Sequence, residues 1–260
     1  MQYKAAIFDI DGTLVQIGES APAPATVQAL RSLQQRGVKL VIATGRCMAA
    51  AKGILCPITP DYILCNNGAE VRDAAGRLLV ENRFNEQEMY ALVDFAEDDE
   101  IPLAFSFEDG YYVYVSYTDY KSIYKAKASV EYMVDEADQQ RHLQSMPFAA
   151  GAFATQQQAA AFTQRYPHLG LRWVPYAVGA YDIFRGTVNK AQGLALLAEK
   201  AGFSLAEAAA FGDGANDAEM LAECALGVAM RHGNPALHQS ANHVADSIID
   251  AISHVFGKDA

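Results

Sequence analysis

The sequence predicts an α/β protein, in which a doubly wound, mostly parallel sheet forms a core domain and a smaller α+β domain is inserted into it. Near both ends of the chain, short runs that are apolar throughout alternate with helical patterns, as in parallel sheets covered on both faces. Between residues 81 and 185 the pattern changes to helices and alternating hairpin strands. We therefore expect a core domain from residues 1–80 plus 186–260, and an inserted domain from residues 81–185.

The first part of the core domain contains three short apolar runs, each followed by polar or small residues. These runs are residues 5–10 (AAIFDI), 38–45 (VKLVIATG) and 62–69 (YILCNNGA). Between the first two, the segment APATVQALRSLQQRG has apolar residues at helical spacing and ends at Gly37, which suits a C-cap. Strands that are apolar throughout and separated by helices predict parallel pairing with both faces buried.

The inserted domain begins with a helix and a hairpin. The segment NEQEMYALVDFAEDD predicts a helix capped by Asn85, because Glu88 stands at capping-box spacing. The segment PLAFSFEDGYYVYVSY alternates about Asp109-Gly110, which is a hairpin signal. A Gln- and Ala-rich helix near residues 155–166 and the strand-like runs GLRWVPY and AYDIF then repeat the order of one helix and two strands.

The parallel pattern returns in the last part of the chain. A helix over residues 189–202 precedes the strand-like runs EAAAFG, ALGVAM and HVAD, and a last helix lies near residues 248–257. The two outer parts of the chain therefore complete one sheet.

The composition narrows the class of function. A net charge of −11 argues against binding to nucleic acid or to an anionic membrane, although it leaves room for a basic pocket that takes a small anion. The four cysteines form no C-x-x-C pair, which predicts reduced thiols rather than a zinc site or disulfides. Asp9 interrupts the N-terminal apolar run before a signal-peptide core forms. We expect a cytoplasmic protein; its oligomeric state stays open.

Polar residues that can carry chemistry follow the ends of predicted strands or begin a helix. They are Asp9-Ile10-Asp11-Gly12-Thr13, Thr44-Gly45, Lys190 and Asp213-Gly214-Ala215-Asn216-Asp217. Ligands of open parallel sheets bind at the carboxyl ends of the strands, so these residues are expected to converge. Several carboxylates in one place repel each other unless a cation neutralises them, and a hard ion with oxygen ligands, Mg²⁺, meets that need.

A hydroxyl, backbone amides and a lysine beside such an ion form a seat for a phosphoryl group. One aspartate of the first motif can then attack phosphorus, and the other, two residues away, can exchange protons with the leaving oxygen and with water. Each motif alone has a simpler interpretation. Asp-Gly pairs mark turns, DGANDAE resembles part of a calcium loop, Thr44 can cap a helix, and Lys190 can be a solvated helix residue. The combination of four motifs in order favours a catalytic site.

DIDGTL, ATGR, Lys190 and GDGANDAEM resemble the four motifs of the haloacid dehalogenase-like superfamily. The inserted domain resembles the cap of its Cof-type (type IIB) phosphatases, and the whole chain is similar to the bacterial sugar-phosphate phosphatases of that group. The resemblance implies a Rossmann-like core, with Asp9 as nucleophile and Mg²⁺ ligand. It implies that Asp11 is the acid/base and gives the metal its backbone carbonyl, and that Asp213 is the other carboxylate on the metal.

The resemblance also implies a set of phosphate contacts. Thr44, Lys190 and Asn216 are expected to bind the phosphoryl group, together with Gly45 and Ile10, and Asp217 is expected to orient the metal's water ligands or Lys190. The cap is expected to contact the leaving group, and the candidates for substrate contacts, in the cap and beside the core motifs, are Arg46, Asn66, Asn67, Trp173, Tyr176, Tyr181 and Asp182. For Trp173 and Tyr181, packing in the cap's own core is the competing interpretation.

These observations predict a Mg²⁺-dependent phosphatase that hydrolyses small phosphorylated metabolites, with hexose phosphates favoured, through an aspartyl-phosphate. A phosphotransferase or phosphomutase that uses the same intermediate is the alternative, and release of phosphate without an added acceptor distinguishes the two. A signalling receiver domain also places acidic residues, Thr and Lys around Mg²⁺. Receivers are about half as long and have no cap, which argues against that class.

Overall fold

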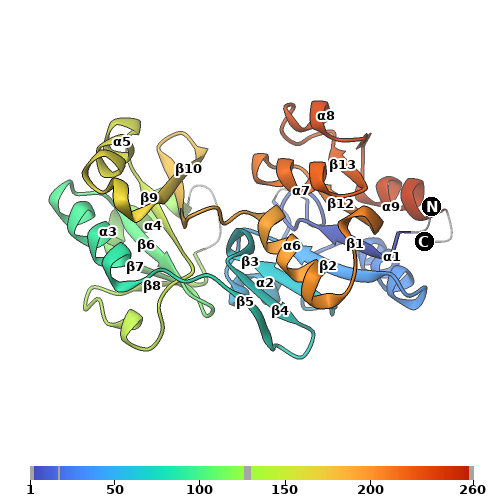
Figure 1. Ribbon diagram of the computed structural model, residues 1–260, viewed down its shortest axis with the longest axis horizontal. Coiled ribbons are helices and arrows are strands. Elements are labelled where there is room, and N and C mark those ends of the chain that lie inside the picture. The colour runs from blue at the N-terminus through green and yellow to red at the C-terminus, as the bar shows by residue number, and fades with distance from the viewer. Residues whose placement is uncertain (1–2, 17, 126–129, 258–260) are drawn as a thin grey trace. The chain divides into compact units, whose positions relative to one another are not determined.

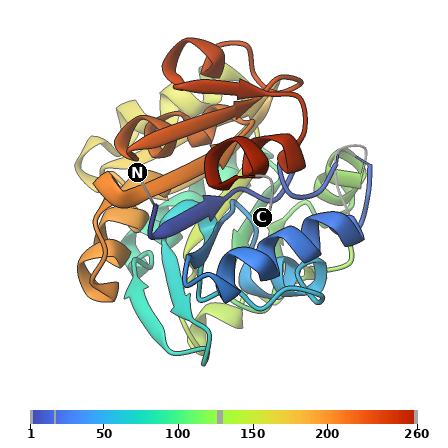
Figure 2. The ribbon, with the colours of Figure 1, turned by 90° about the vertical axis from the view of Figure 1, so that its right-hand side faces the viewer.

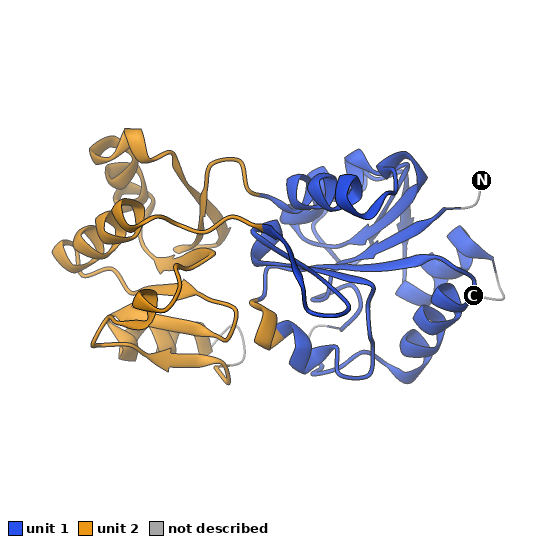
Figure 3. Cartoon of the chain, turned by 60° about the horizontal axis from the view of Figure 1, so that its bottom comes forward, with its two compact units in different colours: residues 1–46, 51–80, 189–260 blue, residues 47–50, 81–188 orange. Residues whose placement is uncertain are grey.

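The computed structural model describes residues 3–16, 18–125 and 130–257. The chain divides into two compact units, shown in Figure 3. We call Met1–Arg46, Ala51–Val80 and Asn189–Ala260 the core unit, and Cys47–Ala50 with Glu81–Val188 the inserted unit. Each unit is built around its own sheet (Figure 1). No helix in the described ranges is both long and apolar enough to cross a membrane.

The sheet of the core unit confirms the predicted doubly wound, mostly parallel class. Its order in the described residues is β14-β13-β12-β1-β2-β3-β4-β5. All neighbours from β14 to β3 are parallel, and β4 pairs with β3 antiparallel. The strands are β1 (Ala5–Phe8), β2 (Lys39–Ala43), β3 (Tyr62–Cys65), β4 (Glu70–Asp73), β5 (Leu78–Glu81), β12 (Ala208–Gly212), β13 (Leu226–Met230) and β14 (His243–Ala245). Strands β4 and β5 were not among the predicted elements, because their polar residues interrupt the apolar run that marks the other strands of this sheet.

Helices cover both faces of this sheet, which is why its inner strands are apolar throughout. Figure 2 shows α1 (Pro24–Gln35) and α9 (Ile248–Phe256) side by side over one face. On the other face, α6 (Lys190–Ala201) and α7 (Ala218–Glu223) pack against alternate residues of β1 and β12. Helix α2 (Met48–Ile54) begins in residues assigned to the inserted unit and ends in the core unit. The core unit also contains α8 (Leu237–Ser240) and the short turns η1 (Asn66–Gly68) and η5 (Ala215–Asp217).

The inserted unit is an α+β fold with the order β10-β11-β9-β6-β7-β8 in its described residues. Its strands are β6 (Leu103–Ser106), β7 (Tyr111–Val115), β8 (Met133–Asp135), β9 (Ala149–Phe153), β10 (Leu171–Ala177) and β11 (Ala180–Arg185), and its helices are α3 (Glu86–Asp98), α4 (Tyr117–Lys125) and α5 (Gln156–Arg165). The predicted capping box of α3 is confirmed, with Asn85 and Glu88 each bonded to the other's backbone. The hairpin predicted about Asp109-Gly110 joins β6 to β7.

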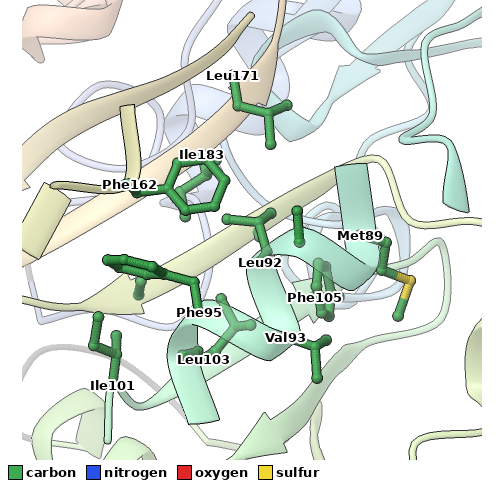
Figure 4. Close-up of a cluster of buried hydrophobic side chains, with 14 of the residues drawn as sticks. Met89, Leu92, Val93, Phe95, Ile101, Leu103, Phe105, Phe162, Leu171 and Ile183 are labelled. Carbon is green, nitrogen blue, oxygen red and sulfur yellow. The ribbon is translucent and has the colours of Figure 1, made fainter. Parts of the chain in front are cut away.

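The core of the inserted unit lies between its sheet and helices α3 and α5. Figure 4 shows Leu92 and Phe95 of α3 directed toward Leu103 and Phe162, which come from the sheet and from α5. The opposite face of the sheet packs against α4 through a smaller apolar cluster that includes Tyr120. The two faces of this sheet therefore have different neighbours, and this difference decides where the substrate candidates of β10 and β11 lie.

Candidate active site

The candidate catalytic residues lie at one edge of the core sheet. Asp9 follows the end of β1, Thr44 follows β2 and Asp213 follows β12. These strands are neighbours and run parallel, because β1 pairs with both β12 and β2. Their carboxyl ends therefore meet at the same edge, where ligands bind in sheets of this kind.

Lys190 lies in the first turn of α6, and its ammonium joins two carboxylates. Its Nζ donates to Asp9 Oδ1 at 2.5 Å and to Asp217 Oδ1 at 2.7 Å. The Lys190 side chain is 0% exposed. Burial by itself would lower the pKa of Lys190, but the charges of Asp217 and Asp9 outweigh it and raise that pKa, so the ammonium stays charged.

At Asp9 the effect of burial on the pKa outweighs the effect of the opposite charge nearby. Burial raises the pKa of its carboxyl well above the ordinary value, and the nearby charges of Asp217 and Asp11 raise it further against the lowering effect of Lys190. One ammonium is therefore too little positive charge for the carboxylates gathered here. A second cation beside Asp9 would stabilise its ionised, nucleophilic form.

Asp217 shapes the loop after β12. Its Oδ2 accepts hydrogen bonds from the backbone amides of Asp213 at 3.0 Å and Gly214 at 2.9 Å, while its Oδ1 accepts from Lys190. Both of its oxygens thus have protein partners. This arrangement fits a residue that orients Lys190 and the loop better than it fits a direct metal ligand.

The donor set fits a hard divalent cation. Carboxylate oxygens of Asp9, Asp213 and Asp217 lie within 4.8 Å of one another. Burial raises the pKa of Asp213, and the charge of Asp217 raises it further, while a hydrogen bond from Thr13 Oγ1 at 3.3 Å lowers it. Clustered carboxylates that offer only oxygen donors are the ligands that hard divalent cations prefer.

Close contacts made by two glycines bring the motifs together. Gly12 has φ +82°, and a Cβ there would lie 2.2 Å from Asp213 Oδ2, so a larger residue would strain the loop after β1 and displace the Asp213 side chain. A Cβ at Gly193 would lie 2.6 Å from Gly68 Cα. This contact places the first turn of α6, and hence Lys190, against the η1 turn.

The η1 turn contributes Asn67 to the site. The Asn67 Oδ1 accepts from Asn216 Nδ2 at 2.8 Å, and its backbone amide donates to Thr44 O at 3.0 Å. A Cβ at Gly45 would lie 3.2 Å from Asn67 Nδ2. The structure therefore brings Thr44, Gly45 and Asn216 together around Asn67. Asn66 is buried in the same turn, and its backbone amide donates to Arg46 O at 2.9 Å.

Arg46, predicted as a substrate contact, is paired with Asp11. Its Nε and Nη2 donate to the two carboxylate oxygens of Asp11 at 2.8 and 2.7 Å. The Asp11 side chain is 56% exposed, which is far more than the 8% of Asp9. The acid/base candidate thus lies at the open side of the site, whereas Ile10 between the two aspartates is fully buried.

The candidates of the inserted unit separate onto two faces of its sheet. Tyr181 belongs to the buried cluster under α3 and α5, and Trp173 packs against that cluster. Asp182 follows Tyr181 on the same strand, so its side chain points to the other face. Asp182 is half-buried, and burial raises its pKa to about 7. Burial raises the pKa of the Tyr176 phenol, and the nearby carboxylate of Asp182 raises it further.

Sequence reasoning missed one side chain that touches the β1 loop. His232, which follows β13, places Nε2 2.6 Å from Gly12 O. The segment after β13 contains no residue pattern that marks it as functional, and only the fold brings it to Gly12, 220 positions away.

Comparison with protein families matches residues 6–256 to the haloacid dehalogenase-like hydrolases. The chain belongs to this family. The match spans nearly the whole length, and it confirms the resemblance of the four motifs. The two units of this haloacid dehalogenase-like hydrolase thus lie within one family model.

Individual relatives of this haloacid dehalogenase-like hydrolase are phosphatases by name. A Haemophilus influenzae protein, provisionally named a phosphatase, is 26% identical over 270 residues, covering 100% of this chain and 99% of that protein. HMP-PP phosphatase of Klebsiella pneumoniae is 24% identical, covering 96% and 93%. The structure of the HAD subclass IIB sugar phosphatase BT4131 is 25% identical with a TM-score of 0.78, covering 96% and 98%. The chain is an enzyme of the phosphatase class within this family.

Proposed function

We propose that this enzyme hydrolyses phosphate monoesters of small metabolites, with hexose phosphates as its main substrates, with Mg²⁺ as cofactor and Asp9 as nucleophile. The observation that carries this proposal is the buried contact of Lys190 with Asp9 and Asp217, beside the carboxylate of Asp213. A buried ammonium among carboxylates supplies one positive charge, and the site is short of a second.

The side chains of Asp9 and Asp213 and the backbone carbonyl of Asp11 would hold the magnesium ion. When bound, the ion neutralises these carboxylates and part of the charge on the phosphate. The raised pKa values of Asp9 and Asp213 support this assignment, because each carboxylate would gain stability from a nearby cation.

Side chains of the protein carry out the attack on phosphorus and the proton transfers. A carboxylate oxygen of Asp9 attacks phosphorus, and the ester oxygen leaves with a proton from Asp11, which produces an aspartyl-phosphate on Asp9. Water attacks this intermediate while Asp11 takes the proton, and phosphate and free Asp9 are released. Lys190, the Thr44 hydroxyl and the Asn216 amide hold the phosphoryl oxygens, with backbone amides near Ile10 and Gly45.

The exposed position of Asp11 supports its role. A group that protonates a leaving oxygen must reach the substrate, and Asp11 lies at the open side of the site while Asp9 is buried. Arg46 forms two hydrogen bonds to this carboxylate and so holds it in a single orientation. In this proposal Arg46 orients Asp11 and lies close to the leaving group.

The preference for sugar phosphates has its own support. One structural neighbour is described as a HAD subclass IIB sugar phosphatase. Within the inserted unit, Asp182 and Tyr176 offer a carboxyl and a phenol on the face opposite the α3–α5 core. Such groups suit hydroxyl-rich ligands. We propose that this face of the inserted unit contributes to substrate choice, whereas Trp173 and Tyr181 serve its core.

The deciding experiment measures phosphate release from an aryl phosphate and from a panel of phosphorylated metabolites, without any added acceptor. We expect turnover with Mg²⁺, none after thorough chelation with EDTA, and recovery when Mg²⁺ is added back. Hexose phosphates should have the highest kcat/KM in the panel. Full activity after chelation would disprove the metal assignment, and transfer to an acceptor without phosphate release would indicate a phosphotransferase or phosphomutase.

A further inference from the structure

We propose that His232 is a positioning residue of the catalytic site, which holds the Gly12 carbonyl and thereby the turn that carries Asp11. The inference rests on the proposed function, because it assigns a task to that same site. His232 Nε2 lies 2.6 Å from Gly12 O. A carbonyl only accepts hydrogen bonds, so Nε2 carries the hydrogen and donates.

In the turn after β1, the peptide group that joins Gly12 to Thr13 is held only weakly apart from its contact with His232. The Gly12 amide donates to Val15 O at 2.8 Å, which fixes the peptide that contains the Asp11 carbonyl. The next peptide is held by the Thr13 amide, whose bond to Ile10 O is long, at 3.3 Å. Gly12 has φ +82° and no side chain, so its backbone rotates more freely than that of other residues. The bond from His232 removes this freedom.

The segment that carries His232 also holds the loop after β12. The amide of Asn234 donates to Asp213 O at 2.7 Å. Gly233 packs so closely that a Cβ there would lie 2.6 Å from Asp213 Cβ. Residues 232–234 therefore brace both loops that present the candidate metal ligands. His232 contributes the contact to one loop, and the two residues after it contribute the contacts to the other.

This arrangement has a consequence for metal binding. Asp11 and Asp213 come from different loops, and a cation between them binds well only if both loops keep their relative position. Thr13 and Asp213 are joined by one long hydrogen bond of 3.3 Å. The contact from His232 to Gly12 reinforces this junction. Loss of the imidazole should weaken metal binding more than it weakens the fold, because the His232 side chain is exposed and buries little area.

The test compares His232→Ala with His232→Gln and with His238→Ala. His238 is a matched control, because its Nε2 also contacts a backbone carbonyl, Met230 O at 3.2 Å, within the same segment. Calorimetric titration of the metal-free proteins with Mg²⁺ gives the dissociation constant, and thermal melts in EDTA report on the fold. Turnover of an aryl phosphate at saturating Mg²⁺ gives kcat separately.

We expect His232→Ala to raise the Mg²⁺ dissociation constant about tenfold, the lower end of the range for groups that orient metal ligands. Its melting temperature in EDTA should stay close to that of the wild type. His232→Gln, whose amide also donates, should recover most of the affinity, and His238→Ala should retain it.

Equal Mg²⁺ affinity in His232→Ala and wild type would overturn the inference, as would an equal loss in His238→Ala. These outcomes leave the proposed function standing if the wild type binds Mg²⁺ and releases phosphate. A wild type that does neither would refute the proposed function, and the role of His232 would fall with it.

Discussion

Lys190 Nζ lies 2.5 Å from Asp9 Oδ1, although 181 positions separate the two residues in the chain. The contact joins the end of the first strand to the start of a helix that follows the whole inserted unit. The ammonium is buried, and it also binds Asp217. This pair links the fold to the chemistry, because the ammonium that joins the end of β1 to the start of α6 also lies beside the atom proposed to attack phosphorus.

Asp9→Asn should lose nearly all turnover, by about a thousandfold or more, as expected when the nucleophile of a catalytic unit is removed. An amide cannot attack phosphorus as a carboxylate does. The measurement is steady-state hydrolysis of an aryl phosphate, with a thermal melt to establish that the variant is folded. A folded variant that keeps more than about a tenth of the wild-type rate would exclude Asp9 as the nucleophile.

Asp11→Asn should reduce the turnover of alkyl phosphates more than the turnover of aryl phosphates. An alkoxide leaves poorly without a proton, and general acid–base assistance is typically worth about 10²–10⁴-fold. The ratio of the rates on a hexose phosphate and an aryl phosphate should therefore fall steeply. With the aryl ester, rapid-quench analysis should also detect phosphoenzyme on Asp9, because Asp11 no longer activates water.

Arg46→Gln is the control for that variant, since it breaks the pair with Asp11 but keeps the carboxylate. Because Arg46 orients Asp11, we expect this variant to lower the rate on the alkyl ester more than the rate on the aryl ester, but by a smaller factor than Asp11→Asn does. If Asp11→Asn lowered the rates on both ester types by the same factor and trapped no intermediate, Asp11 would be a structural residue.

Lys190→Met should destabilise the protein by about 3–5 kcal/mol, because it leaves carboxylates buried without their cation. The pKa of Asp9 is already raised by burial and by its neighbours, and loss of Lys190 raises it further. The native variant then binds a proton that the unfolded chain has lost, so its stability falls as the pH rises. The deficit should therefore be larger at pH 8 than at pH 5.

Urea denaturation at both pH values, without Mg²⁺, measures this difference. Lys200→Met on the same helix is the control, since Lys200 is exposed. An equal deficit at the two pH values would show that Lys190 acts through packing rather than through its charge.

Asp182→Asn should change the pH dependence of stability. Burial raises the pKa of Asp182 from 3.8 to about 7, so between these values the native state holds a proton that the unfolded state releases. The free energy of unfolding therefore decreases as the pH rises through this window. The variant lacks this titration, and it should become progressively more stable than the wild type from pH 4 to pH 7.

Thermal melts across that range, compared between the two proteins, test the prediction. Asp135→Asn is the matched control, because Asp135 is an exposed carboxylate on the same sheet. Parallel melting curves for wild type and Asp182→Asn would show that Asp182 titrates normally.

The fold class, and the positions of the candidate catalytic groups at strand ends, could be predicted from the sequence. Runs such as AAIF and LVIA are apolar throughout, and only a parallel sheet with both faces covered buries such strands. Asp9, Thr44 and Asp213 each follow one of these runs. Parallel strands end at a common edge, so their convergence could be predicted without coordinates.

Which side chains meet at longer range depends on how the whole chain packs. The pairs Arg46–Asp11, Asn216–Asn67 and His232–Gly12 join loops that lie far apart in the chain, and no local pattern specifies them. The structure also separated Tyr181 from Asp182. Successive side chains of a strand point to opposite faces of the sheet, and this alternation can be predicted from the sequence. The face that helices α3 and α5 cover depends on the packing of the whole unit.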